Sequence, residues 1–224
     1  MDKKRVVRLT YLRFFSGIPV LGLVFFLPAG TLNYWEAWVY LVILFTPMFF
    51  VMQYLIKNDP TLLERRMRTK EQASEQSLII KLSYVYFVVA FLLPGFDKRY
   101  SWSDAPLWLV ILAQALVFLG YILVILVFKE NSYASRTVEV DEEQKVIDTG
   151  PYAVVRHPMY VGVTALYVLS PLALGSTWGL IASVFIIPLI IARILSEEKI
   201  LVNELAGYQE YQQKVKYRLI PMIW

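Results

Sequence analysis

Long apolar runs, separated by short polar segments, dominate this chain of 224 residues. A helix that crosses a bilayer needs about 20 predominantly apolar residues, and several runs approach or exceed that length. The pattern predicts four membrane-spanning helices, at about residues 14–28, 35–56, 78–93 and 107–128. The third is expected to stop at Pro94-Gly95. We therefore expect an all-α integral membrane protein.

The C-terminal apolar stretches follow a different pattern. Tyr160–Leu174 is short for a full span and is followed, after a turn at residues 175–177, by Trp178–Ile194. This arrangement predicts a helical hairpin that enters the membrane and returns. From Glu197 onward, apolar residues recur at helical spacing, which predicts an amphipathic C-terminal tail that is interrupted at Gly207.

Composition agrees with a membrane protein, because 58% of the residues are hydrophobic and the mean hydropathy is +0.53. Soluble domains contain about 45–50% apolar residues. The placement of positive charge predicts the orientation, since cytoplasmic loops of membrane proteins are enriched in lysine and arginine. Of the 22 lysines and arginines, only Lys98 and Arg99 fall on the far side of the predicted helices. Both termini are therefore expected to face the cytoplasm.

A scarcity of metal-binding side chains limits the chemistry of the chain. It has no cysteine and one histidine, His157. The lack of cysteine excludes disulfides, thiolate nucleophiles and cysteine-based metal sites, and no spacing of aspartates and glutamates suggests a carboxylate cage. We therefore predict no metal. The basic residues between positions 65 and 70 are expected to contact anionic lipid headgroups rather than nucleic acid.

The histidine lies in the stretch TGPYAVVRHPMYVG, at residues 149–162. Pro158 is suited to the first turn of a helix, where its missing N–H would have no partner. His157 would then lie at a helix N-terminus, where the backbone N–H groups and the helix dipole favour an anion. Together with the charge of Arg156, this predicts a site for a carboxylate or a phosphate. Alternatively, Arg156 contacts lipid phosphates and His157 caps the helix.

Two glycines in the same stretch predict local features of the backbone. Gly150-Pro151-Tyr152 predicts a turn, because proline fixes φ and glycine permits a tight approach. Gly162 would let a flat ligand or another backbone lie close to the helix. Small residues are also common where membrane helices pack, so a packing role explains Gly162 equally well.

A second polar cluster follows the last apolar stretch. Arg193 and Glu197 are four residues apart and so share one face of a helix. An arginine inside a membrane helix is costly unless it is paired or lines a cavity. An ion pair with snorkelling would explain Arg193, but it leaves the second carboxylate, Glu198, unexplained. Neighbouring carboxylates point in different directions, so we expect at most one of them to face Arg193.

These residues form a spaced pattern. GPY-(x)3-RHP-x-Y-x-G is followed by R-(x)3-EE-(x)2-L, then by Y-(x)2-Y-(x)3-V and a closing RLIP. The pattern resembles the isoprenylcysteine carboxyl methyltransferase family, and related phospholipid methyltransferases share much of it. The resemblance covers the chain from about Asn131 to Trp224, whereas the first four predicted helices match only in general character.

The resemblance implies transfer of a methyl group from S-adenosylmethionine to a substrate in the membrane. Residues 1–128 would then form the membrane core and residues 129–224 a catalytic region facing the cytoplasm, within one structural domain. Arg193 and Glu197 are the predicted catalytic residues, and Glu198 is a second candidate to contact a cation of the cofactor. The match at residues 144–147 rests on position rather than residue type. The cofactor would contact Gln144, Lys145, Val146, Ile147, Tyr152, His157, Pro158, Met159, Tyr160 and Glu197.

The methyl acceptor in this family is a carboxylate, which Arg193 would face. The acceptor here would be lipophilic, similar to an isoprenylcysteine, and would enter laterally from the membrane lipids. A carboxylate is already a nucleophile, so no general base is required. Arginine orients a carboxylate through two parallel hydrogen bonds, which a lysine does less well.

Other functions are compatible with the same residues. The acceptor is alternatively a phospholipid amine or a thiol, either of which would have to be deprotonated. Sterol-type reductases that use NADPH have a similar C-terminal region, although the paired Glu197-Glu198 and the short chain favour the methyltransferase. A non-enzymatic transporter or scaffold is the third alternative. The short chain also suggests a prokaryotic cytoplasmic membrane, and neither the acceptor nor the oligomeric state follows from the sequence.

Overall fold

The computed structural model describes residues 3–67, 74–135, 140–141 and 143–224. Residues 68–70 of the predicted basic segment lie outside these ranges. All regular secondary structure in the described ranges is helical, as predicted. In chain order the elements are α1 (Lys3–Ala29), α2 (Trp35–Asn58), α3 (Pro60–Met67), α4 (Ser74–Tyr100), α5 (Leu107–Glu130), the 3-10 helix η1 (Gly150–Ala153), α6 (Pro158–Ala173), α7 (Thr177–Ser183), α8 (Ile186–Glu204) and α9 (Tyr208–Lys214).

Five helical segments of the described chain are long and apolar enough to cross a membrane: Lys4–Ala29, Trp35–Asn58, Ile80–Tyr100, Leu107–Glu130 and Thr177–Glu204. The protein is therefore an integral membrane protein that crosses the bilayer several times. The short first arm of the predicted hairpin is present as α6, which has 16 residues. The prediction of about four spanning helices is too low, because α7 and α8 together cover 28 residues and form a fifth candidate span.

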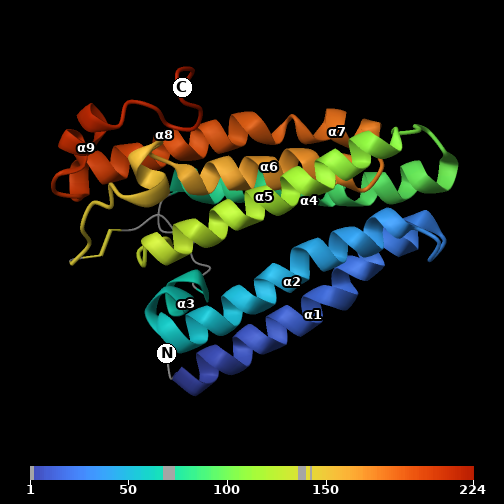
Figure 1. Cartoon of the computed structure of the whole chain (residues 1–224), viewed down its shortest axis with the longest axis horizontal. Coiled ribbons are helices and arrows are strands. Elements are labelled where there is room, and N and C mark those ends of the chain that lie inside the picture. The colour runs from blue at the N-terminus through green and yellow to red at the C-terminus, as the bar shows by residue number, and fades with distance from the viewer. Residues whose placement is uncertain (1–2, 68–73, 136–139, 142) are drawn as a thin grey trace.

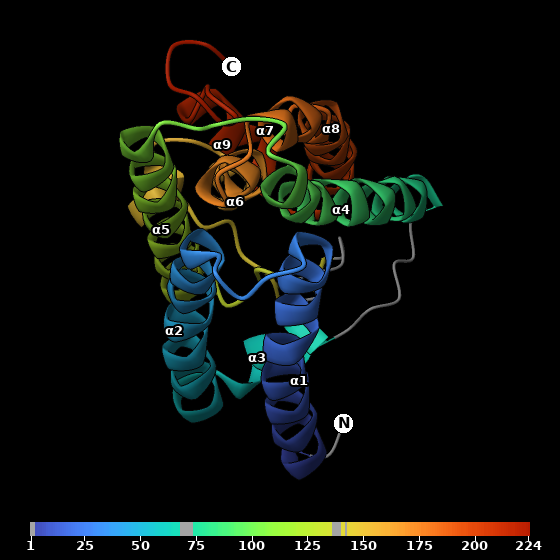
Figure 2. The same ribbon diagram turned by 90° about the vertical axis from the view of Figure 1, so that its right-hand side faces the viewer.

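The helices are arranged in layers. The pair α1–α2 lies on one side of α4 and α5, and α6, α7 and α8 lie on the other (Figures 1 and 2). The N-terminus, η1 and α9 lie at the same end of the helices (Figure 1). The two polar motifs are therefore brought together at this end.

Helix α1 begins at Lys3, well before its predicted start near Phe14. Lysine and arginine are good helix formers, so the basic N-terminal residues continue the helix beyond the apolar stretch. Val6 is buried in a cluster with Leu55 and Leu62, which holds this first part of α1 against α2 and α3.

Helix α4 continues through Pro94-Gly95 to Tyr100, so the predicted stop at this pair is wrong. Proline is tolerated inside a membrane helix when neighbouring groups compensate for the lost hydrogen bond. A Cβ atom at Gly95 would lie 2.8 Å from the carbonyl oxygen of Phe25 and 2.8 Å from Cβ of Pro28. The pair therefore marks a close approach of α4 to α1 rather than a helix end.

Helices α5 and α6 pack with their backbones in contact. A Cβ atom at Gly162 would lie 2.5 Å from the carbonyl oxygen of Gly120, and one at Gly120 would lie 2.9 Å from the carbonyl oxygen of Gly162. Neither position accepts a larger residue unless a helix moves. The packing interpretation of Gly162 is therefore confirmed.

The predicted breaks near the C-terminal end are also present. Gly175 adopts a φ of 83° between α6 and α7, and the Ser176 hydroxyl caps α7 by accepting a hydrogen bond from the N–H of Gly179 (2.8 Å). Helix α8 ends at Glu204, and Gly207, with a φ of 84°, precedes α9. A positive φ of this size favours glycine. The amphipathic tail is thus divided at Gly207, as predicted.

Candidate active site

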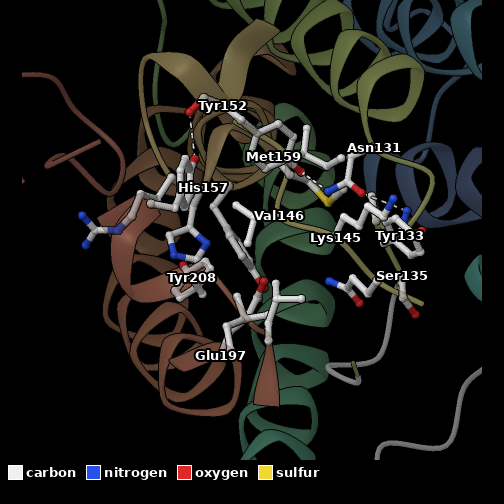
Figure 3. Close-up of a pocket in the computed structure, with 18 of the residues that line it drawn as sticks. Asn131, Tyr133, Ser135, Lys145, Val146, Tyr152, His157, Met159, Glu197 and Tyr208 are labelled. Carbon is white, nitrogen blue, oxygen red and sulfur yellow. Dashed lines mark hydrogen bonds between the residues drawn. The ribbon is translucent and has the colours of Figure 1, made fainter. Parts of the chain in front are cut away.

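A cavity of about 850 Å³ lies at the end of the helices that carries both polar motifs. Its walls come from residues 131–135 and 144–147, η1, the first turn of α6, the last turns of α8, and α9 (Figure 3). Pro158 and Glu198 do not line the cavity, but most predicted site residues do: Gln144, Lys145, Val146, Ile147, Tyr152, His157, Met159, Tyr160, Arg193 and Glu197.

Tyr152 joins three segments of the cavity wall. Its hydroxyl accepts a hydrogen bond from the side-chain amide of Asn131 (2.8 Å), and its main-chain carbonyl accepts one from the Tyr211 hydroxyl (2.8 Å). Burial raises the pKa of the Tyr152 phenol above its usual range, so the group stays protonated. The turn that carries Tyr152 needs a glycine, because Gly150 has a φ of 54° and a Cβ atom there would lie 3.0 Å from the carboxylate of Glu130.

The predicted helix N-terminus is present. His157 is the residue before α6 and Pro158 is its first residue. His157 thus occupies the N-cap position, but its side chain makes no capping hydrogen bond with the described residues. The C-terminal segment holds this motif instead, because the main-chain N–H groups of Arg156 and His157 donate to the carbonyl oxygens of Tyr217 and Arg218 (2.9 and 3.0 Å).

Glu198 is the centre of a buried charged cluster beside the cavity. Its Oε1 accepts a hydrogen bond from Nε of Arg156 (2.8 Å) and lies 3.2 Å from Nε2 of His157. Its Oε2 accepts one from Nε of Arg218 (2.8 Å). Only 7% of Arg156 is exposed, which excludes the alternative that it contacts lipid phosphates. The cluster fixes the RHP motif to α8, and a contact between Glu198 and the cofactor stays a prediction.

Arg193 and Glu197 meet through Tyr160. Nε of Arg193 donates to the Tyr160 hydroxyl (2.9 Å), and that hydroxyl donates to Oε2 of Glu197 (2.7 Å). The two motif residues thus share one face of α8, as predicted. Glu198 binds the neighbouring cluster instead, so of the two carboxylates Glu197 belongs with Arg193. The bridging role of Tyr160 was not predicted.

An apolar groove of about 870 Å³ adjoins the polar cavity, between α4, α6 and α8. The groove and the cavity share Ser135, Met159, Tyr160 and Arg193. The polar pair Tyr160 and Arg193 therefore lies in a wall common to both spaces. Much of the remaining groove lining is apolar and includes Phe87, Val163, Tyr167, Ile186, Leu189 and Ile190.

Two arginines of α3 support the segment that follows α5. Arg65 donates to the carbonyl oxygen of Ser132 (2.7 Å) and pairs with Asp141 (2.8 Å). Arg66 donates to the carbonyl oxygen of Ser135 (3.3 Å) and also lines the groove. These two basic residues bind the chain itself, in contrast to the expected contact with lipid headgroups.

Comparison with known proteins gives a family match for part of the chain. Residues 108–207, which include α5, η1, α6, α7, α8 and much of the cavity wall, match the phospholipid methyltransferase family. The match covers a little less than half of the chain. Over these residues the chain is similar to membrane methyltransferases, which favours that function over the sterol-reductase and non-enzymatic alternatives. The family generally uses S-adenosylmethionine as the methyl donor.

The chain also has the fold of a solved protein, the eukaryotic intramembrane Ras methyltransferase ICMT (isoprenylcysteine carboxyl methyltransferase). The two chains superpose with a TM-score of 0.50 over 97% of this chain and 86% of that one, at 18% sequence identity. At this identity the likeness concerns the fold alone. A search of curated proteins finds no match.

Several residues that line the cavity were not predicted. The most informative is Tyr208, because its hydroxyl is buried and has no hydrogen-bond partner among the described residues. Figure 3 shows Tyr208 near His157. The helical spacing of Leu201, Leu205 and Tyr208 indicates a shared face, but nothing in that pattern indicates a cavity. The other unpredicted lining residues include Asn131, Tyr133, Ala134, Ser135 and Tyr211.

Proposed function

We propose that this methyltransferase moves a methyl group from S-adenosylmethionine, bound in the polar cavity, to a carboxylate of a lipophilic acceptor in the apolar groove. The observation that carries the proposal is the shared wall, since Tyr160 and Arg193 line both spaces. A polar cofactor and an apolar acceptor each have a matching environment, and their reactive ends meet at this wall.

The side chains around the cavity fit the charges of S-adenosylmethionine, which has a carboxylate, an ammonium group and a sulfonium group. The N-terminus of α6 at His157 suits the carboxylate. Glu197 suits a cation. The hydroxyl of Tyr208, for which the described part of the chain supplies no partner, is also explained, because buried polar groups are almost always hydrogen-bonded, here to a bound ligand. When bound, the cofactor supplies an electrophilic methyl group.

The chain's own residues position the acceptor. Arg193, held by the Tyr160 hydroxyl, presents a planar guanidinium that can bind a carboxylate through two hydrogen bonds. The apolar groove excludes water from the reacting charges. Alignment of two reactants contributes about 7–11 kcal/mol of barrier lowering. A carboxylate is ionised at neutral pH, so none of these residues has to act as a base.

We propose that the site lies on the cytoplasmic side of the membrane. Lys98 and Arg99 are in the last turn of α4, at the opposite end from the site, and most other basic residues belong to the site's end. An excess of lysine and arginine marks the cytoplasmic side. The acceptor then enters the groove laterally from the lipid, and neither a metal nor a nucleic acid takes part.

A phospholipid amine is the second candidate acceptor. The description of the family that residues 108–207 match favours it. An amine has to lose a proton before it attacks the methyl group, and so does a thiol. These acceptors therefore differ from a carboxylate both in the product bond and in the pH dependence of the rate.

The test uses the full chain in vesicles, incubated with methyl-labelled S-adenosylmethionine and a membrane extract. We expect a labelled methyl ester, which mild alkali cleaves to methanol. A label that resists alkali and remains on a phospholipid amine would establish the second candidate. Absence of transfer, together with thermal stabilisation by NADPH but not by S-adenosylhomocysteine, would overturn the methyltransferase proposal.

A further inference from the structure

The segment of residues 216–224 presents apolar side chains at its tip. Met222 is 86% exposed and Ile223 77% exposed, more than any other large hydrophobic residue that the structure describes. Ile220, in the same tip, is 51% exposed. Apolar groups of this size, grouped and exposed, indicate contact with an apolar partner.

The tip is held in place by contacts among the other residues of the same segment. The main-chain N–H groups of Arg218, Leu219 and Ile220 all donate to the main-chain oxygen of Trp224 (2.9, 3.0 and 3.1 Å), which closes the segment into a loop. The guanidinium of Arg218 lies over the Trp224 ring, 5.2 Å from its centroid, and its Nε binds Glu198. The exposed residues therefore project from an ordered loop.

The loop lies alongside a membrane helix rather than beyond its end. Leu219 and Trp224 pack against the cluster that contains Ile190 and Ile194 of α8. Residues Thr177–Glu204, which include α8, form a candidate span. In Figure 1 the loop leaves the side of α8 and points away from the other helices. Its tip is thus directed outward from the bundle, where a membrane protein meets lipid.

Exposed lysines are present in the loop and on the helix beside it. Lys216 is exposed at the start of the loop, and Lys199 is exposed on the adjoining part of α8. Apolar side chains flanked by lysine and arginine are typical of segments that lie in the membrane interface, with the apolar groups at the acyl boundary and the cations among anionic headgroups.

We propose that Ile220, Met222 and Ile223 insert into the interface of an anionic bilayer, in the leaflet beside the active site. The insertion anchors the segment that organises the RHP motif. The carbonyl oxygens of Val215 and Lys216 bind the Arg156 guanidinium, and those of Tyr217 and Arg218 bind the main-chain N–H groups of Arg156 and His157. The proposal concerns attachment to the membrane and does not depend on the methyl acceptor.

The absence of cysteine from the chain permits a direct test, since a single introduced cysteine can be labelled without background. Met222→Cys and, in a second protein, Ile223→Cys are labelled with an environment-sensitive fluorophore. Each full-length protein is placed in vesicles of phosphatidylcholine and phosphatidylglycerol. The control is Gln213→Cys on α9, an exposed polar position.

For both loop positions we expect emission at shorter wavelength than for the control, quenching by lipids with a nitroxide near the headgroup, and protection from iodide in the water. The control should be quenched by iodide and not by the nitroxide. Iodide quenching of both loop labels to the level of the control would overturn the proposal. Protection from iodide without nitroxide quenching would do so too, and would indicate that protein, such as a second copy, covers the loop.

Discussion

At the scale of single residues, the hydroxyl of Tyr160 connects the two charged groups of the site, since it accepts a hydrogen bond from Arg193 and donates one to Glu197. A hydrogen bond to a charged group contributes about 1.5–3 kcal/mol. We expect Tyr160→Phe to keep the fold and to lower methyl transfer by roughly 10- to 100-fold, because about 1.4 kcal/mol corresponds to a factor of ten. The measurement is the initial rate with saturating labelled cofactor.

Tyr100→Phe is the matched control for that substitution. Tyr100 is exposed at the opposite end of α4, so loss of its hydroxyl should leave the rate unchanged. If Tyr160→Phe also retained the parental rate, the hydroxyl bridge would have no part in positioning Arg193.

The adjacent residues Glu197 and Glu198 permit a paired test. Glu198→Gln removes the carboxylate that Arg156 and Arg218 share, and breaking a buried charged pair costs about 3–5 kcal/mol. We therefore expect a large loss of thermal stability. Glu197→Gln should leave stability near that of the parent and weaken the binding of S-adenosylhomocysteine, which calorimetry measures. A stable Glu198→Gln protein with lost cofactor binding would show that the two roles are exchanged.

At the scale of elements, the contact between α5 and α6 sets the position of the cavity. A methyl group at Gly162 would lie 2.5 Å from the Gly120 carbonyl oxygen. Overpacking costs typically about 1–3 kcal/mol, so Gly162→Ala should lower the temperature of thermal unfolding in detergent. Gly22→Ala in α1 is the control, because a Cβ atom at Gly22 would meet no neighbouring atom of the described residues within 4 Å. Equal unfolding temperatures for the two variants would contradict the backbone contact.

Most helices follow from hydropathy, but some of their ends do not. The length of an apolar run indicates which residues suit the hydrocarbon of the bilayer. The helix itself continues for as long as its backbone hydrogen bonds are maintained. Helix α1 therefore extends through basic residues to Lys3, and α4 extends through Pro94 to Tyr100. The breaks at Gly175 and Gly207 were predictable, because both need a positive φ.

The candidate site could be predicted where its residues are neighbours in the sequence. Residues 157–160 are consecutive, and Arg193 and Glu197 are four residues apart in a helix, so the sequence alone brings the members of each group together. Tyr208 and the groove residue Phe87 come from α9 and α4, and only tertiary packing brings them to α6. No local pattern in the sequence predicts contacts between residues of different helices. The position of Tyr160 between Arg193 and Glu197 could not be predicted for the same reason.

At the scale of the whole molecule, membrane and water environments meet at one wall. The groove lies between helices that form or adjoin candidate spans, whereas the cavity is built largely from the segments beyond them. Arg193, in the wall between the two, can contact ligands on either side. This arrangement explains why an arginine is retained inside a candidate span, where an isolated charge would be costly.

The proposed acceptor makes a prediction about pH for the whole enzyme. A carboxyl group has a pKa of about 4, so between about pH 7 and pH 9 it stays ionised and the rate of methyl transfer should be flat. An amine with a pKa of about 10.4 is mostly protonated there, so its methylation should rise roughly tenfold per pH unit. Three phenols of the cavity wall stay protonated over this range, because burial raises the pKa values of Tyr152, Tyr208 and Tyr211 above their usual range. Initial rates at saturating cofactor distinguish the two acceptors, and a steep rise would exclude the carboxylate.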